Sequence, residues 1–333
     1  MVEDIGIESF LEETSVTKVV QPALAAILFP FLGENPRSYF KQMPSASRNV
    51  EIVVENLLKL SSKPKKLFTI LKPVCKMTTN YGKAQKETKI KEQHLVYTDL
   101  DHRIPFRPTD DILYVYQLAH MALFSRELVE NYPNHVFKEV IKCFLDVEKE
   151  AVEVFQKYPT VMPRFTDHDR ITLKATQAFD NPLNCCPSLH IAYSLLIYNI
   201  SKVLGFDKWD KELWKSFEQA AELTIRPVLY TKQHALIDVA FGMQVAKKSF
   251  EKIFSFKFED LTAAFSDFEK RDQDIPYRAI EAIYYNLDDP CKKENSLADV
   301  VEQFLKVNKF PVIKPKENNA YFDIRSGKVV KLF

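Results

Sequence analysis

The sequence predicts an all-α protein, a bundle of helices with a small β-hairpin near residue 330. Apolar residues recur three and four positions apart in successive segments between residues 51 and 255, whereas strand-like alternation is scarce. Hydrophobic residues make up 46% of the 333, which is enough to bury a large core. The exception is YFDIRSGKVVKLF, which alternates around Ser326-Gly327 and predicts the hairpin.

The first 90 residues are expected to form a helical section packed on the rest of the protein. Residues 51–77 carry apolar side chains at helical spacing and predict a helix. The next stretch, residues 78–93, is polar and basic and predicts a solvated loop. The apolar run from Val19 to Leu32 falls short of the roughly 20 residues that cross a bilayer. We expect it to be a buried helix.

Five further helices follow in order, each with a signal at one of its ends. Asp110 or Thr109 lies near the start of the first, and Pro159 ends the second. Pro187 is expected in the first turn of the third, with Gly205 just past its end. The five predicted helices span residues 110–132, 134–158, 187–206, 211–225 and 233–254.

Composition excludes several classes of function. Only 6 glycines, with no glycine-rich run, argue against a dinucleotide or P-loop phosphate site. The balance of 46 basic and 45 acidic residues gives no reason to expect nucleic acid as a partner. Five cysteines without a Cys-x-x-Cys pair predict neither a disulfide framework nor a zinc site. The acidic start, MVEDIGIESFLEE, is unlike a signal peptide, so we expect a soluble, cytoplasmic protein.

His234 and Asp238 are the first candidate catalytic pair. Four positions apart, they share one face of a predicted helix. A carboxylate there accepts a hydrogen bond from the Nδ1–H of the imidazole. This fixes the tautomer and leaves Nε2 free to attack a substrate. The alternative is an ordinary pair on a helix surface.

A second candidate segment is Pro187-Ser188-Leu189-His190, at the start of a predicted helix. Backbone N–H groups and the helix dipole favour an anion there, and the Ser188 hydroxyl adds a donor. His190 is suited to protonate a leaving oxygen. The alternative is a serine N-cap with an incidental histidine.

Lys157 and Arg164 form a further candidate segment, the first of the three in chain order, with six residues between them around a turn that contains proline. A guanidinium and an ammonium that converge on one point suit a phosphate dianion. Such a spacing of two cations is common, so the pair has little meaning alone.

The order of the three segments resembles the signature of the type-2 phosphatidic acid phosphatase superfamily. This superfamily includes bacterial acid phosphatases, glucose-6-phosphatase and the vanadium haloperoxidases. Its motifs are Lys-x6-Arg-Pro, Pro-Ser-Gly-His and Ser-Arg-x5-His-x3-Asp. This chain matches them with three departures: Phe165 for the proline, Leu189 for the glycine, and Pro227-Val228 for Ser-Arg.

Two longer stretches are similar to the branch that contains inositol phosphorylceramide synthases. They are AFDNPLNCCPSLHIAYSL and DLDHRIPFRPTDDILYVY. The resemblance covers roughly residues 95–255. It implies a phosphatase-like catalytic core at residues 91–255, between an N-terminal section at 1–90 and a C-terminal extension at 256–333.

The resemblance implies a helical fold of the acid phosphatase and haloperoxidase type and a mechanism without metal or cofactor. His234, oriented by Asp238, would attack phosphorus, and His190 would protonate the departing oxygen. The phosphate-binding groups would be Lys157, Arg164, Ser188 and the backbone at Leu189. Because Val228 replaces the arginine of the third motif, Lys232 or Arg226 is expected to supply the third cation.

The function expected from this reasoning is that of a phosphatase or phosphotransferase acting on an organic phosphate or diphosphate. The abundance of aromatic residues suits a substrate with a hydrophobic tail, such as an isoprenoid. Three alternatives stay open: an isoprenoid diphosphate cyclase or lyase using the same site, a vanadate-dependent haloperoxidase, and a binding protein with a relict site. No transmembrane span is expected, and peripheral contact with a membrane stays open.

Overall fold

The computed structural model describes most of the chain from residue 64 onward. The described residues are 64–165, 167–170, 173–174, 176–177, 182–293, 296–313, 320–323 and 328–331. The predicted helix at Val19–Leu32 and the predicted hairpin turn at Ser326-Gly327 lie outside them. None of the helices in the described part combines the length and the apolar character that a bilayer crossing needs.

The described chain is mostly helical, which confirms the predicted fold class. The long helices are α4 (Pro64–Thr88), α6 (Ile112–Asn131), α7 (Asn134–Lys157), α9 (Leu189–Val203), α11 (Lys211–Tyr230), α12 (Leu236–Phe254), α14 (Tyr277–Lys293) and α15 (Leu297–Val307). Shorter helical pieces are α5 (Asp99–Arg103), η2 (Pro108–Asp111), α10 (Phe206–Trp209), η3 (Thr262–Ala264) and α13 (Phe265–Arg271).

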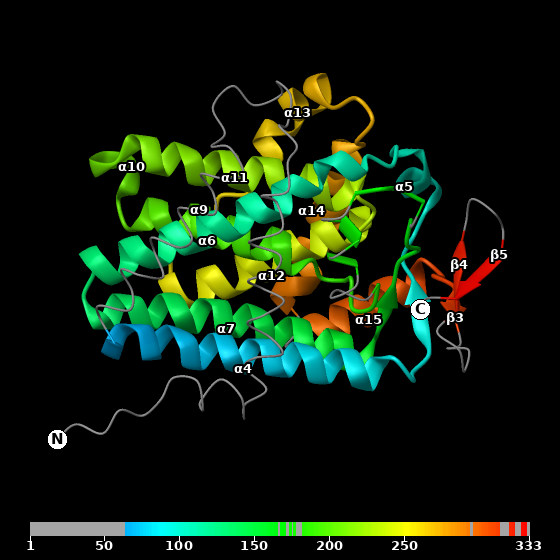
Figure 1. Ribbon diagram of the computed structural model, residues 1–333, viewed down its shortest axis with the longest axis horizontal. Helices are drawn as coiled ribbons and strands as arrows, with labels where there is room; N and C mark the ends of the chain where they lie inside the picture. Colours follow the sequence, from blue (N-terminus) through cyan, green and yellow to red (C-terminus); the bar gives the residue numbers. More distant parts are fainter. Residues whose placement is uncertain are drawn as a thin grey trace.

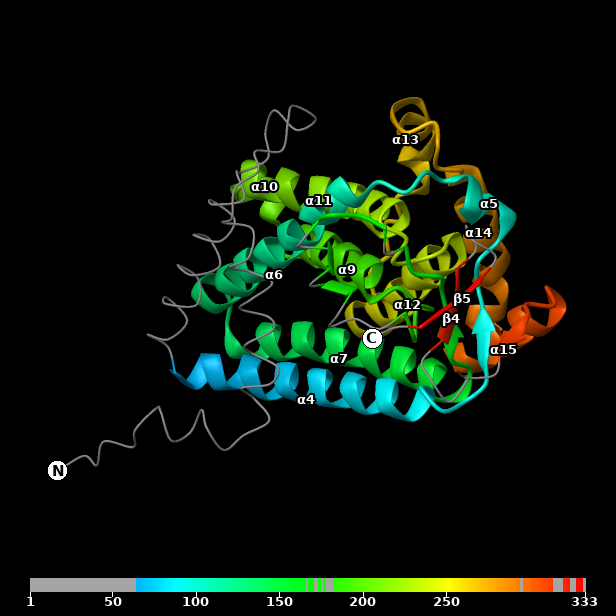
Figure 2. The same cartoon turned by 45° about the vertical axis from the view of Figure 1, so that its right-hand side comes forward.

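The long helices form layers, with α9 and α12 between the others (Figure 1). Helices α4 and α7 lie side by side along one edge, and α7 packs on α12. On the other side, α11 packs on α9 and α6 packs on α11. Figure 2, turned by 45°, shows the same order. Because α9 and α12 are covered from several sides, Leu236 at the start of α12 is buried, whereas Leu189 and His190 at the start of α9 are partly exposed.

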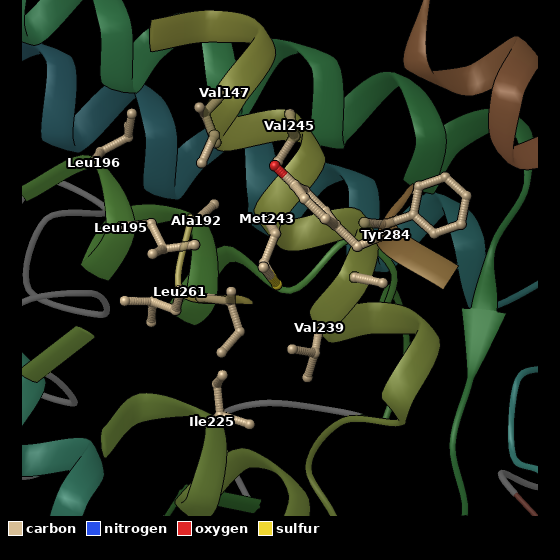
Figure 3. Packing of buried hydrophobic residues seen from close by; sticks show 14 of the residues in the cluster. Val147, Ala192, Leu195, Leu196, Ile225, Val239, Met243, Val245, Leu261 and Tyr284 are labelled. Atoms are coloured by element: carbon tan, nitrogen blue, oxygen red, sulfur yellow. The ribbon is translucent and has the colours of Figure 1, made fainter. Parts of the chain in front are cut away.

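One apolar core joins these helices, and Figure 3 shows part of it. Its members include residues of α7, α9, α11, α12 and α14, among them Val147, Ala192, Leu195, Leu196, Ile225, Val239, Met243, Val245 and Tyr284. Each fully buried Val, Leu, Ile or Met side chain in this core contributes about 1.5–3 kcal/mol to stability relative to leaving it exposed. Helix α14 therefore belongs to the same core as the helices that carry the histidine motifs.

The predicted loop at residues 78–93 is wrong over most of its length, because α4 continues to Thr88 and the chain leaves the helix only after it. The sequence looks polar there, yet Ala84 and Thr88 are completely buried. Tyr81, on the same face, packs edge-on against Phe155 of α7, with ring centroids 6.0 Å apart. Three small or aromatic residues at helical spacing are enough to dock the turn, while the charged residues between them face outward.

A small three-stranded sheet is the feature that the sequence did not indicate. It consists of β1 (Gln93–Leu95), β2 (Thr160–Val161) and β3 (Val312–Ile313), in the order β2-β1-β3. Strand β1 pairs parallel with β2 and antiparallel with β3. Strands of two or three residues are too short to show alternation. The predicted hairpin is confirmed as the antiparallel pair β4 (Ala320–Asp323) and β5 (Lys328–Lys331).

The ends of three helices differ from the predicted ends in ways that matter for the site. Helix α9 begins at Leu189 with Ser188 as N-cap, so Pro187 precedes the helix; Gly205 lies past its end with φ 79°, as predicted. Helix α11 runs through Pro227 to Tyr230. Helix α12 begins at Leu236, so His234 lies in the preceding loop.

Candidate active site

Strand β2 brings the first and second motif segments side by side. The backbone N–H of Asn184 donates to the carbonyl of Thr160 over 2.8 Å, and the N–H of Met162 donates to Pro182 over 3.3 Å. The Thr160 hydroxyl accepts from the N–H of Cys186 at 2.9 Å. Residues 160–164 are therefore anchored along the loop that leads to His190.

The start of α9 docks directly on α12, which brings the second and third motif segments together. The N–H of Ser188 donates to the carbonyl of Asp238 over 3.0 Å. Gly242 makes this approach possible, since a Cβ there would lie 2.6 Å from the carbonyl oxygen of Ser188. Only glycine leaves the backbones this close.

His190 and His234 are neighbours. Their ring centroids lie 5.6 Å apart at an interplanar angle of 69°. Two imidazoles more than about 10 Å apart could not act on the same substrate group. The separation of these rings is well below that limit. The two residues come from helix α9 and from the loop before α12, 44 positions apart in the sequence.

His234 is held by a backbone carbonyl in addition to its predicted partner. Its Nδ1 lies 2.9 Å from the carbonyl oxygen of Cys185 and 3.4 Å from Oδ2 of Asp238. A carbonyl oxygen only accepts, so Nδ1 carries the proton and Nε2 keeps its lone pair. The prediction that Asp238 is the main acceptor needs correction, because His234 precedes the helix and lies nearer to Cys185.

Asp238 is completely buried and serves the loop as well as the histidine. Its Oδ2 accepts from the N–H of Ala235 over 2.8 Å. Burial raises the pKa of this carboxyl, and the hydrogen bond with His234 opposes that rise. Asp238 therefore fixes the loop that carries His234 and places acidic character beside the ring.

His190 contacts a residue that the sequence did not single out. Its Nδ1 lies 2.9 Å from Oε1 of Gln117, on helix α6. Gln117 is 73 positions away, in a stretch that reads as an ordinary buried helix. Its one visible peculiarity is an amide within the apolar run LYVYQLAHMAL. No local pattern links it to His190.

Arg164 is the predicted cation that lies at the histidines. Its side chain is buried, and Nη1 donates to Oε1 of Gln233, the residue before His234. The amide of Gln233 is neutral, and this bond orients the guanidinium. The first motif segment thus reaches the site through its arginine.

Two buried polar side chains beside the site make no hydrogen bond within the described residues. They are the Ser188 hydroxyl and the side-chain amide of Asn184. Both residues are at most 3% exposed. Ser188 also does not cap α9 with its side chain, so the first-turn N–H groups near Leu189 are not engaged by it. Such groups suit an anionic ligand.

Lys157 does not join the other predicted phosphate-binding residues. It is the last residue of α7, its side chain is 49% exposed, and Nζ pairs with Glu153 of the same helix at 2.7 Å. This pairing and the nearby Glu302 of α15 raise the pKa of Lys157. Helix α7 ends at Lys157, at the surface, and the chain then enters the protein along the buried strand β2. Lys157 is therefore exposed although Arg164, seven positions later, is buried.

Neither candidate for the third cation is placed to fill that role. Lys232, with φ 56°, points its Nζ at the carbonyl of Asp101 over 2.6 Å and also at that of Ile104. Arg226, on α11, pairs with Asp272 at 3.2 Å. Val228, at the position where the signature that this sequence resembles has arginine, is buried. Both cations are committed to the fold, which corrects the expectation.

Within the described residues, no group of three or more His, Cys, Asp or Glu side chains is arranged to hold a metal ion. No family model, no curated protein and no solved structure matches this chain.

Proposed function

We propose that this protein is a metal-independent phosphatase or phosphotransferase whose nucleophile is His234. The observation that carries the proposal is the pair of imidazoles 5.6 Å apart, with Nδ1 of His234 committed to a carbonyl so that its Nε2 is nucleophilic. The two histidines supply, from separate elements, a buried nucleophile and a partly exposed acid–base group, which are the minimum for a covalent phosphoryl transfer.

The reaction proceeds in two displacements. Nε2 of His234 forms a bond to phosphorus as the P–O bond to the leaving group breaks, and protonated His190 donates its proton to the departing oxygen. His190 then takes a proton from water or an alcohol, which attacks phosphorus and breaks the N–P bond. The products are the first alcohol and either inorganic phosphate or a new phosphate ester.

Stabilisation of the phosphoryl oxygens falls on fewer cations than the family pattern implies. Arg164 supplies charge, and Ser188, Asn184 and the first turn of α9 supply neutral donors. With Lys157, Lys232 and Arg226 engaged elsewhere, we expect modest turnover that depends strongly on Arg164.

A hydrophobic tail on the substrate is the finer part of the proposal. Phe165 follows Arg164 directly, and its ring lies 5.3 Å from that of Phe106, which is partly exposed. An aromatic surface next to the phosphate-binding arginine favours esters with an apolar group over small polar ones.

The test is a phosphate-release assay on phosphomonoesters and prenyl diphosphates, with vanadate as inhibitor. His234→Ala should lower kcat by about a thousand-fold or more, because the mechanism has no substitute for the nucleophile. The matched control is His120→Ala: His120 is equally buried but packs edge-on against Phe217, and its loss should leave kcat nearly unchanged. Equal rates in wild type and His234→Ala would rule out this mechanism.

A further inference from the structure

Gln117 of α6 binds His190 twice and is itself held by a third hydrogen bond. Its Nε2 donates to the carbonyl oxygen of His190 over 2.6 Å and to the hydroxyl of Ser194 over 2.9 Å. Its Oε1 lies 2.9 Å from Nδ1 of the same histidine. The side chain is 6% exposed, so these bonds are made away from water.

The direction of every hydrogen bond in this network is determined by two backbone carbonyls. The hydroxyl of Thr224 donates to the carbonyl of Ala220 over 2.6 Å, so it accepts from Ser194 at 2.9 Å. Ser194 then accepts from Gln117. Because the carbonyl of His190 also only accepts, the amide nitrogen of Gln117 must face it, and Oε1 must face Nδ1. Nδ1 of His190 therefore carries a proton.

We propose that Gln117 is a positioning residue that holds His190 in its Nδ1–H form and so makes Nε2 the nitrogen that transfers the proton. This rests on the proposed function of the site. The network reaches from α6 through Ser194 of α9 to Thr224 of α11. Three helices thus hold one imidazole ring in a fixed orientation and a fixed tautomer.

An amide partner also gives His190 different electrostatics from His234. Asp238 adds acidic character beside His234, whereas Gln117, Ser194 and Thr224 carry no charge and do not titrate. His234 is a titratable group in ring contact with His190. A neutral hydrogen-bond acceptor orients an imidazole without trapping its proton, which suits a group that must both donate and accept in one cycle.

The test is nitrogen NMR of the full chain labelled at histidine, combined with the phosphate-release assay. Wild-type His190 should show a proton on Nδ1 in its neutral form. In Gln117→Glu, a carboxylate at the same position should raise the pKa of the ring by about one unit or more. In Gln117→Ala the ring should show a mixture of tautomers, and kcat should fall about ten-fold or more with a smaller change in KM.

Gln244→Ala is the matched control. Gln244 of α12 is 1% exposed and donates to the carbonyl of Tyr284 over 2.8 Å, so its removal also breaks a buried amide hydrogen bond, but away from His190. The His190 signals should not change in this variant. A wild-type ring with its proton on Nε2, or an unchanged pKa in Gln117→Glu, would overturn the proposal. Altered ring signals without any phosphate release would uphold the positioning role and refute the proposed function.

Discussion

At the scale of the single residue, Asp238 shows how burial and hydrogen bonding oppose each other in the site. It is completely buried, and Oδ2 faces both the N–H of Ala235 and the ring of His234. Oδ1 makes no hydrogen bond within the described residues. Removing a carboxylate from water without satisfying both oxygens disfavours its charged form, which is why the pKa of Asp238 lies above its ordinary value of 3.8.

This raised pKa predicts how stability responds to pH. The unfolded chain loses the Asp238 proton near pH 3.8, whereas the folded chain keeps it to higher pH. The contribution of Asp238 to stability is therefore complete below pH 3.8 and is lost as pH rises through the folded pKa. Urea denaturation at a series of pH values should show wild type losing stability relative to Asp238→Asn as pH rises above 3.8.

The control for this experiment is Asp267→Asn. A hydrogen bond with Lys270 lowers the pKa of that exposed carboxyl, so any difference from wild type should be small and should have the opposite sign. A difference between wild type and Asp238→Asn that stays constant with pH would contradict the prediction.

At the scale of the element, the contact between α9 and α12 decides whether the two histidines meet. The first turn of α9 lies on α12 at Gly242, and the N–H of Ser188 bonds to the carbonyl of Asp238. His190 and the His234 loop project from the two ends that this contact brings together. Any side chain at position 242 must separate the helices or shift one along the other.

Gly242→Ala should therefore destabilise the protein even though alanine favours helices. Its Cβ would lie 2.6 Å from the carbonyl oxygen of Ser188 and 3.1 Å from Cβ of Ile191, an overlap that costs about 1–3 kcal/mol. Phosphate release should fall as well. Gly82→Ala in α4 meets nothing within 4 Å and should stabilise by about 0.5–1 kcal/mol. If the denaturation midpoints of Gly242→Ala and Gly82→Ala moved in the same direction, this prediction would be contradicted.

At the scale of the whole molecule, the segment around α5 is clamped to the loop that carries His234. Lys232 donates to the carbonyls of Asp101 and Ile104. In return, Oδ1 of Asp101 accepts from the N–H of Leu236, at the start of α12, over 2.7 Å. A buried ammonium that bridges two carbonyls ties together parts of the chain about 130 residues apart.

Lys232→Met tests whether this lysine serves the fold or the phosphate. Two buried carbonyls would lose their donor, at about 1–3 kcal/mol each, so the urea midpoint should fall clearly. The dissociation constant for vanadate, measured well below the unfolding transition, should change less than about three-fold. Lys157→Met, which removes an exposed lysine, should alter neither quantity. Vanadate binding weakened ten-fold at unchanged stability would identify Lys232 as a phosphate ligand.

Local sequence determined the helices and the residues that carry the chemistry. Apolar spacing of three and four residues predicts α6, α7, α9 and α12 because burying one face of a helix depends on neighbours along the chain. The histidine motifs can be recognised for the same reason, since Ser188 and His190 are two positions apart and His234 and Asp238 are four positions apart. These patterns give the order of the motifs along the chain, but they give no distances between the motifs in space.

Tertiary structure decided which of those residues meet and what holds them. Ala84 is buried in a helical turn whose sequence predicts a solvated loop. Lys232 donates to backbone carbonyls, and Lys157 is exposed although Arg164 is buried. The acceptor of His234 is a carbonyl, and that of His190 is Gln117, 73 positions away. Such partners are set by the packing of helices distant in sequence, and every residue has the same backbone carbonyl, so no local pattern marks them.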